Sequence, residues 1–312
     1  MHDSHGHGHV LVIVGAVIAP SLHQLAVFRA VATHLNYTRA ANELHLSQPA
    51  VTRQVQLLER ELGVRLFARR GRRSVLTDDG MDVLNCAVRI FGLFEDLEQV
   101  LAARRGMLQG RLRVVATSTA GEYLLPSLLA GFRRVHAGIH VALRVANREQ
   151  VLRALTAGEA DLAVMGRPPD LSGWTNRALM SNELVAIASP DHPCLGSGVM
   201  HANDLASETF FLREAGSGTR TAVEAFLREA GVPIDDDAVL GSDSGIKQAV
   251  MAGLGISILS RQALDLELAA GRLAILPVEG LPLPRQWFLV EPADAASPAT
   301  RAFSRYLLDA VR

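Results

Sequence analysis

The spacing of apolar residues changes twice along the 312-residue chain. From residue 21 to residue 77 apolar residues recur every three or four positions, which predicts short amphipathic helices. From residue 78 to residue 105 one narrow apolar stripe continues without an internal proline, which predicts a single long helix. From residue 111 onward, short apolar runs alternate with helical patterns, which predicts an α/β unit with largely parallel sheets.

The first of these regions carries the signals of helix starts. Thr38 is placed to cap a short second helix, in which Ala40 and Ala41 permit close helix crossing. Ser47 is placed to cap a third helix, with Pro49 in its first turn. The third helix is expected to bury an apolar side and to expose a polar one. The apolar side consists of Val51, Val55 and Leu58, and the polar side consists of Gln48, Thr52, Arg53 and Gln56.

Two small helices, a tight turn and a third helix with polar tips form a helix-turn-helix. Arg69, Arg70, Arg72 and Arg73 surround Gly71 between two β-prone runs, which predicts a basic hairpin, or wing. Gln and Arg at a helix N-terminus can read base edges in the major groove, and wing arginines can neutralise phosphates. A protein-binding module of three helices with a solvated arginine cluster would show the same pattern.

The long helix is predicted for residues 78–107, with acidic residues at its positive end and glycines after its last turn. Its narrow stripe suits a seam between helices of two chains, and packing of the stripe on its own domain is equally compatible. The stripe consists of Leu84, Val88, Phe91, Phe94, Leu97 and Leu101.

The last two hundred residues are long enough for two lobes, expected at residues 111–166 with 274–312 and at residues 167–273. The expected strands are Leu112–Ala116, Val141–Val145, Leu162–Met165, Leu184–Ala188, Phe210–Leu212, Val239–Gly241, Ile256–Leu259, Leu273–Leu276 and Trp287–Val290.

Polar residues that follow these strands are candidates for a ligand site, because ligands of open α/β sheets bind beyond the carboxyl ends of strands. The segment 213–220 combines glycines, hydroxyl groups and two arginines, which suits an anionic, phosphorylated metabolite. A capped helix start with solvated arginines is the alternative, and a lone Lys247 is also compatible with solvation. The candidate residues are Thr117, Ser118, Thr119, Asn147, Arg148, Gly166, Arg167, Arg213, Ser217, Gly218, Thr219, Arg220 and Lys247.

The net charge of −1 hides a split between the two ends of the chain. Residues 21–113 hold 14 arginines and nine acidic residues, a net charge of +5. Residues 114–312 hold 17 basic and 22 acidic residues, a net charge of −5, and Asp3 completes the total. The basic part therefore coincides with the predicted helix-turn-helix and the long helix.

The composition excludes several classes of protein. With 49% hydrophobic residues and two distant cysteines, the chain is neither disordered nor built on disulfides, and it fits a reducing cytoplasm. Residues 1–20 are expected to be a disordered His-rich extension without a membrane span, although alternating histidines are also compatible with Ni or Zn. We expect no structural or catalytic metal and no membrane association.

Enzymes and solute receptors are two further classes to weigh. The chain lacks the G-x-S-x-G, H-E-x-x-H, G-x-x-x-x-G-K-[ST] and G-x-G-x-x-G motifs, so we expect no catalytic activity. The C-terminal two hundred residues alone would fit a solute-binding receptor, but such a receptor has no basic helix-turn-helix.

Residues 22–80 resemble the DNA-binding domain of LysR-type bacterial transcription regulators. The resemblance includes Phe28, Ala40-Ala41, the run Ser47–Thr52, Leu58-Glu59 and Leu76-Thr77. It implies a winged helix-turn-helix whose third helix reads the major groove, a dimerising linker helix and an effector domain like a periplasmic binding protein, with the ligand between two lobes. It also implies a dimer of dimers that binds promoter DNA and acts on RNA polymerase. The DNA-binding residues expected from the pattern and the resemblance are Thr38, Ser47, Gln48, Pro49, Thr52, Arg53, Arg70, Arg72 and Arg73.

The effector region further resembles the Calvin-cycle subgroup, which controls the operon for ribulose bisphosphate carboxylase. The similarity lies in residues 147–151, 161–169, 213–220, 246–255, 267–273 and 278–281. It implies that the co-inducer is a sugar phosphate or NADPH and that the protein has no resident cofactor. Control of an unrelated metabolic operon by a different small anion is the alternative.

Overall fold

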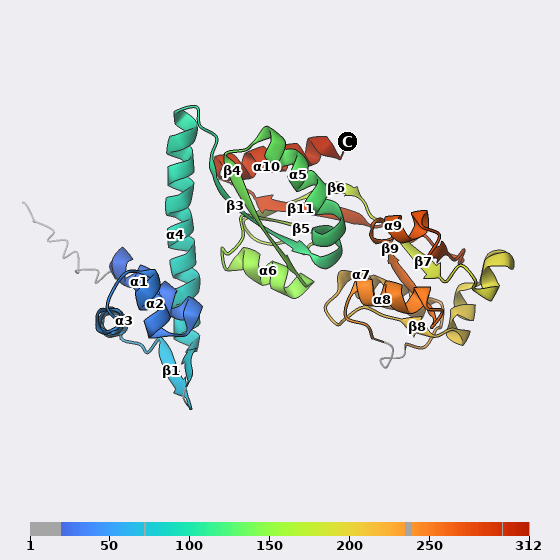
Figure 1. The fold of residues 1–312 in the computed structure, drawn as a ribbon, viewed down its shortest axis with the longest axis horizontal. Helices are drawn as coiled ribbons and strands as arrows, with labels where there is room; N and C mark the ends of the chain where they lie inside the picture. Colours follow the sequence, from blue (N-terminus) through green and yellow to red (C-terminus); the bar gives the residue numbers. More distant parts are fainter. Residues whose placement is uncertain (1–19, 72, 235–238, 295, 312) are drawn as a thin grey trace, which may run out of the picture. The chain divides into compact units, whose positions relative to one another are not determined.

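The structure is a computed structural model that describes residues 20–71, 73–234, 239–294 and 296–311 (Figure 1). The chain divides into two compact units, residues 1–90 and residues 91–312. The long helix α4 (Asp78–Arg104) contributes to both units. Within the described residues, no helix combines the length and the apolar character needed to cross a membrane.

Three short helices form the core of the first unit. Ser21 caps α1 in a reciprocal capping box with Gln24, and Ser47 caps α3 as predicted. The cap of α2 is Asn36, whose Oδ1 accepts hydrogen bonds from the backbone N–H groups of Thr38 and Arg39, so the expectation that Thr38 is the cap is wrong. The helices are α1 (Leu22–His34), α2 (Tyr37–Glu43) and α3 (Gln48–Leu62). Their buried side chains include Val27, Val31, Ala40, Ala41, Val51 and Val55.

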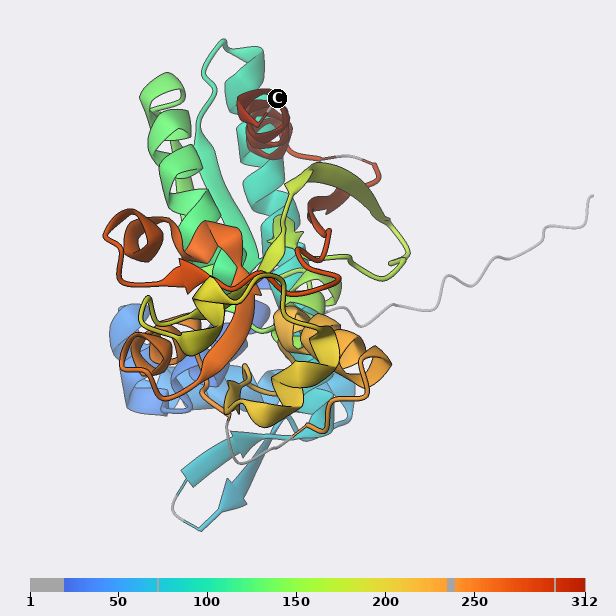
Figure 2. The ribbon, with the colours of Figure 1, turned by 90° about the vertical axis from the view of Figure 1, so that its right-hand side faces the viewer.

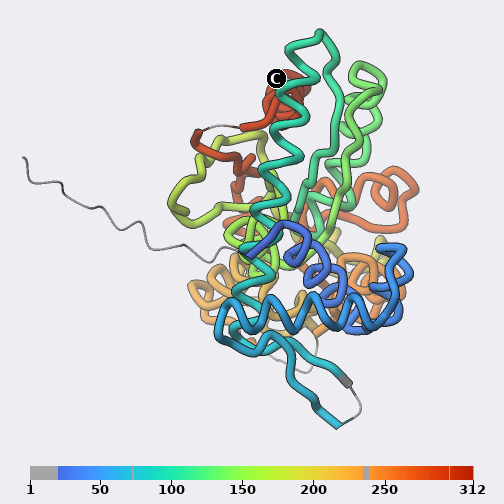
Figure 3. The backbone as a smooth tube through the Cα atoms, turned by 90° about the vertical axis from the view of Figure 1, so that its left-hand side faces the viewer, coloured from blue at the N-terminus to red at the C-terminus, as the bar shows by residue number. Residues whose placement is uncertain are grey.

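A two-stranded antiparallel hairpin follows, formed by β1 (Phe67–Arg70) and β2 (Arg73–Leu76). Figures 2 and 3 show it projecting from the helices of its unit. Phe67 packs against the rings of Phe28 and Tyr37, with ring centroids 5.5 and 5.9 Å apart. The base of the hairpin is tightly packed, because a Cβ atom at Gly80 would lie 2.1 Å from the Leu66 carbonyl oxygen.

The helix α4 leaves part of its apolar stripe uncovered. Leu84, Val88 and Phe91 are half-buried, whereas Phe94, Leu97 and Leu101 are between 44% and 51% exposed. Packing on its own domain therefore does not account for the second half of the stripe.

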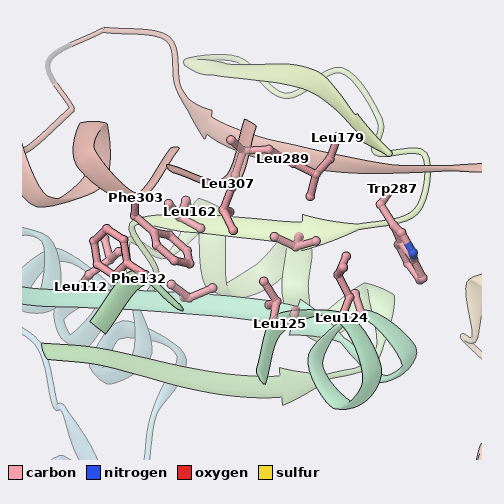
Figure 4. Close-up of a cluster of buried hydrophobic side chains, with 14 of the residues drawn as sticks. Leu112, Leu124, Leu125, Phe132, Leu162, Leu179, Trp287, Leu289, Phe303 and Leu307 are labelled. Carbon is pink, nitrogen blue, oxygen red and sulfur yellow. The ribbon is translucent and has the colours of Figure 1, made fainter. Parts of the chain in front are cut away.

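The first lobe of the C-terminal unit is a five-stranded sheet in the order β4-β3-β5-β11-β6. The helices α5 and α10 cover one face and α6 covers the other, and Figure 4 shows Phe132 of α5 meeting Phe303 of α10 in the larger core. The elements are β3 (Gly110–Thr117), a π-helix η1 (Ala120–Leu124), α5 (Leu125–Val135), β4 (Ile139–Ala146), α6 (Arg148–Thr156), β5 (Leu162–Met165), β6 (Trp174–Ser181), β11 (Gln286–Pro292) and α10 (Pro298–Ala310).

The second lobe is a four-stranded sheet in the order β10-β7-β9-β8, with α7 packed on one face and α8 on the other. Its elements are β7 (Leu184–Ala188), β8 (Phe210–Phe211), α7 (Gly218–Glu229), α8 (Asp243–Met251), β9 (Ile256–Ser260), α9 (Asp265–Ala269), β10 (Ala274–Ile275) and the 3₁₀ turns Pro193–Gly196, Ala202–Ser207 and Arg261–Ala263. The chain crosses between the lobes twice, and the crossings lie side by side because Asn182 N–H donates to the Arg285 carbonyl at 2.8 Å.

Several sequence expectations about this unit are wrong. Both sheets are mixed rather than largely parallel, since β11 and β7 run antiparallel to their neighbours. Trp174–Ser181 is an edge strand of the first lobe. The sequence suggested no strand there because only one of its eight side chains is buried, so it has no continuous apolar run. The lobe boundaries shift accordingly: residues 174–181 belong to the first sheet and Ala274–Ile275 to the second. Val239 forms only a single bridge with Leu212 instead of a strand.

Candidate functional site

The N-terminus of α3 presents the polar surface that the sequence predicted. Ser47 Oγ accepts from the Ala50 N–H at 3.3 Å, and Gln48 Nε2 donates to Thr52 Oγ1 at 3.2 Å. Pro49 and Arg53 are exposed, while Val51, Val55 and Leu58 are buried as expected. Thr38 lies in the first turn of α2 with its side chain exposed. This places a capped helix start with amide, hydroxyl and guanidinium groups on one accessible surface.

Arg69 and Arg70 of the wing have exposed side chains. Arg70 is exposed at the end of β1, and Gly71 has a positive φ of 62° in the turn that follows. Arg73 begins β2 and pairs with Arg70, and Arg72 lies outside the described residues.

A buried carboxylate joins α3 to the wing. Glu59 Oε1 accepts from the Leu66 N–H at 2.8 Å and from the Phe67 N–H at 3.4 Å, and Oε2 accepts from Arg65 Nη1 at 3.1 Å. Glu59 and Leu66 are both buried, so the carboxylate fixes the first strand of the hairpin to the third helix. Sequence reasoning did not assign this role to Glu59.

A cleft lies between the two lobes of the C-terminal unit. About 460 Å³ of space, continuous with the surrounding solvent, lies between its walls. Its lining combines ends of strands, two helix N-termini and the crossings between lobes. The lining residues are Thr117, Ser118, Thr119, Asn147, Arg148, Gly166, Asn182, Arg213, Glu214, Ser217, Gly218, Thr219, Arg285 and Trp287.

Most of the candidate ligand residues therefore meet in one place, and four lining residues are additional to them. Asn182 and Arg285 come from the two crossings, Trp287 is the second residue of β11, and Glu214 follows Arg213. The crossings could not be located from the sequence because β6 gave no strand pattern. The nearest sequence signal for Arg285 is its place after Pro284, in a segment without helical or strand periodicity.

Arg213 is almost fully buried and neutralised by carboxylates. Its Nε and Nη2 donate to Glu214 at 2.8 and 2.9 Å, and its Nη1 donates to Asp243. Burial alone lowers the pKa of Arg213, but the hydrogen bonds to Glu214 and the charge of Asp243 outweigh it and raise the pKa. The second oxygen of Asp243 accepts from Thr119 Oγ1 at 2.9 Å, which links the two lobes. Thr119 thus bonds across the lobes, and its side chain makes no capping hydrogen bond to the following helix η1.

Arg148 and Arg285 differ from Arg213 because they donate to backbone carbonyls and not to carboxylates. Arg148 Nη1 donates to the Arg167 carbonyl at 2.6 Å, and Arg285 Nη1 donates to the Gly218 carbonyl at 2.5 Å. Among the described residues, no carboxylate lies within 4.0 Å of either guanidinium. Burial lowers the pKa of both arginines, and the charge of Arg148 lowers the pKa of Arg285 further. The cavity therefore holds two positive charges without a counter-charge.

Three candidate residues do not line this cavity. Arg167 is exposed, and Arg220 pairs with Glu224 through a 2.6 Å contact. Lys247 is buried rather than solvated: Nζ lies 2.7 Å from Glu267 Oε1, donates to the Ala263 carbonyl at 2.8 Å and sits 4.8 Å from the centre of the Tyr123 ring.

One group of side chains has the composition of a metal site in the described part of the chain. His192, Cys194 and Glu208 bring their ligand atoms within 4.8 Å of one another. His192 Nδ1 accepts from the Cys194 N–H at 3.3 Å, and His192 Nε2 lies 3.4 Å from Glu208 Oε2. These contacts describe a hydrogen-bonded group.

Comparison with known families identifies both units. The family described as bacterial regulatory helix-turn-helix protein, lysR family, matches residues 22–81, and the LysR substrate binding domain matches residues 105–312. The chain belongs to the LysR family of transcriptional regulators. The resemblance inferred from the sequence is confirmed, and the solute-receptor and enzyme classes are set aside.

Individual relatives are similar over most of the chain. A RuBisCO operon transcriptional regulator from Allochromatium vinosum is 45% identical over 289 residues, covering 92% of this chain and 95% of the relative. The structure of full-length CbnR complexed with its target DNA has a TM-score of 0.67 and 25% identity, covering 92% of this chain and 98% of that one. The Synechocystis PCC6803 CcmR regulatory domain in complex with 2-PG has a TM-score of 0.62 and 36% identity, covering 65% of this chain and 98% of that one.

Proposed function

We propose that the chain is a metabolite-responsive transcriptional regulator of a carbon-fixation (RuBisCO) operon and acts on promoter DNA in the cytoplasm. One observation carries the proposal: a LysR-type helix-turn-helix and a cavity with uncompensated positive charge occur on the same chain. The name of the Allochromatium vinosum relative supports the operon, and the 2-PG complex of the CcmR domain supports a phosphorylated effector. A sugar phosphate or NADPH is the effector class that we favour.

In this proposal, residues 21–80 bind DNA, residues 78–107 form the linker and residues 111–312 bind the effector. Gln48, Pro49, Thr52 and Arg53 would read bases from α3, with Thr38 and Ser47 beside them, whereas Arg70, Arg72 and Arg73 would contact phosphates. The effector would favour one arrangement of the two lobes, and the linker would carry that preference to the DNA-binding units and to RNA polymerase.

The uncovered stripe of α4 supports self-association through this helix. An apolar helix face that is exposed in one chain is removed from water when the same face of a second chain packs against it. The resemblance to LysR-type regulators favours a dimer of dimers. Sedimentation of the full chain would separate monomer, dimer and tetramer.

Footprinting on the promoter of a RuBisCO operon tests the proposal. We expect protection of a two-part site and a change of that footprint with a sugar phosphate or NADPH. Protection of an unrelated metabolic promoter only would favour the alternative of another operon, and a footprint that saturating effector leaves unchanged would reject the effector class.

A further inference from the structure

The ligand cavity has two chemically different sides. On one side, Arg148 and Arg285 lie near each other without a carboxylate partner among the described residues. On the other side, Arg213 is held by Asp243 and Glu214, so a positive charge faces two negative ones. An anion entering the cavity is attracted to the first side and repelled by the excess negative charge of the second.

We propose that Arg148 and Arg285 together bind a phosphomonoester group of the effector, assisted by the N-terminus of α7, while Arg213 bonds the two lobes and does not bind the anion. The inference rests on the proposed function, since it specifies how the effector of such a regulator is recognised. It also selects among the candidate arginines, because the sequence named Arg148 and Arg167 as candidates but favoured the segment that carries Arg213 and Arg220 as the anion site.

The contacts around Arg285 support this assignment. Its Nη1 donates to the Gly218 carbonyl at 2.5 Å, so the guanidinium lies at the first turn of the twelve-residue helix α7. A Cβ atom at Gly166 would lie 3.2 Å from Arg285 Nη2, and glycine leaves that space open for a ligand. Helix N-termini and paired guanidinium groups both favour a phosphate, whose dianion matches two uncompensated charges.

The two arginines and the N-terminus of α7 come from different parts of the C-terminal unit, so a phosphate that contacts all three would link the lobes. Arg148 belongs to α6 of the first lobe, Gly218 to α7 of the second, and Arg285 to the crossing between them. A phosphate held by all three groups therefore bridges the lobes at their crossing. Nearby, Thr117 Oγ1 is buried without a hydrogen-bond partner among the described residues, which suits a hydroxyl group on the remainder of the ligand.

A phosphomonoester has two sources in the favoured effector class, the phosphate of a sugar and the 2′-phosphate of NADPH, and the phosphate of a small hydroxy acid carries the same chemistry. Titration calorimetry with the full chain separates them through matched pairs of probes, which are phosphoglycolate with glycolate, ribulose bisphosphate with ribulose, and NADPH with NADH. In the pair that contains the effector, we expect the phosphorylated member to bind at least 10-fold more tightly, and inorganic phosphate to compete with it.

Arg148→Gln and Arg285→Gln are each expected to weaken binding of that phosphorylated probe about 10- to 100-fold, the loss of one charge-assisted contact. The matched control is Arg177→Gln, which removes an exposed arginine paired with Glu291 outside the cavity and should leave affinity unchanged. Arg285→Lys restores the charge and should recover part of the affinity, which a merely misfolded variant would not do.

The outcomes separate the inference from the proposed function. If the parent protein binds none of the phosphorylated probes, the effector class itself is wrong. If the parent binds one of them and both glutamine variants bind it equally well, the effector class stands and the two-arginine site is wrong. Equal affinity of the phosphorylated and unphosphorylated members of the binding pair would likewise overturn the site.

Discussion

Substitution of Glu59 by alanine tests whether a buried carboxylate holds the wing to the third helix. In the structure Glu59 Oε1 accepts from the Leu66 N–H at 2.8 Å, and both residues are buried. Glu59→Ala removes the acceptor and leaves the Leu66 N–H without a partner in a site that water does not reach freely. We therefore expect β1 to separate from α3 more often, while α3 itself stays folded.

The magnitude follows from the individual contacts. A hydrogen bond to a charged group contributes about 1.5–3 kcal/mol, and leaving a buried donor unsatisfied costs a similar amount. The 3.4 Å bond from the Phe67 N–H is long and adds little, and Arg65 is 81% exposed, so that ion pair adds less than about 1 kcal/mol. We therefore expect Glu59→Ala to lower the free energy of separating β1 from α3 by about 2 kcal/mol, which makes the open state about 30-fold more populated.

Hydrogen exchange of the full chain, followed at residues 64–70, measures this opening directly. Protection of the Leu66 amide should fall about 30-fold in Glu59→Ala and less in Glu59→Gln, which retains one acceptor oxygen. Glu43→Ala is the matched control, because its exposed contact with His34 should contribute less than about 1 kcal/mol. Protection of Leu66 and Phe67 within threefold of the parent would refute the role of the carboxylate.

Three further predictions concern DNA reading, assembly and pH. Arg53→Ala should reduce discrimination between operator and unrelated DNA, whereas Arg70→Ala should weaken both equally and flatten the salt dependence in gel-shift titrations. Leu97→Glu should shift the sedimentation of the full chain toward monomer, because it places a charge on the uncovered stripe. Burial and the nearby Asp161 raise the pKa of the Asp96 carboxyl and outweigh the charge of Arg113, which lowers it. Ionised Asp96 therefore destabilises the folded chain, so folding stability falls as pH rises from the ordinary pKa of Asp96 to its raised pKa. Asp96→Asn should therefore raise the thermal midpoint at pH 7 and leave it unchanged near pH 3.

Local rules predicted the first unit well because its helices start and bury side chains through contacts close in sequence. Ser47 and Pro49 define the start of α3 by themselves. The cap of α2 was mispredicted because Asn36 and Thr38 are both good caps, and the choice depends on where the chain turns. Leu35, in a left-handed conformation with φ of 46°, makes Asn36 the first residue that can reach the free N–H groups.

In the second unit, the surroundings of the charged residues depend on contacts between residues far apart in the sequence, and local sequence patterns do not reveal such contacts. Lys247 meets Glu267 and Tyr123 from other elements, and no local pattern distinguishes it from a solvated lysine. Arg285 enters the cavity because one crossing is hydrogen-bonded to the other at Asn182, more than one hundred residues away. The sequence also does not show which partner each arginine has. Arg213 is neutralised by Asp243, a residue thirty positions away, whereas Arg148 donates to a backbone carbonyl.

The strand β3 connects the cavity to helix α4 within the C-terminal unit. Its last residue, Thr117, lines the cavity, and near its start the Arg111 carbonyl accepts from Gln99 Nε2 of α4 at 3.1 Å. An eight-residue strand spans about 26 Å, and β3 is paired along its length with β4 and, in its second half, with β5. A strand held in this way cannot stretch or unpair cheaply, so we infer that an effector moves it together with its sheet. Amides of β3 should therefore keep their exchange protection when effector binds, whereas deprotection of β3 would show that the signal travels by local unfolding.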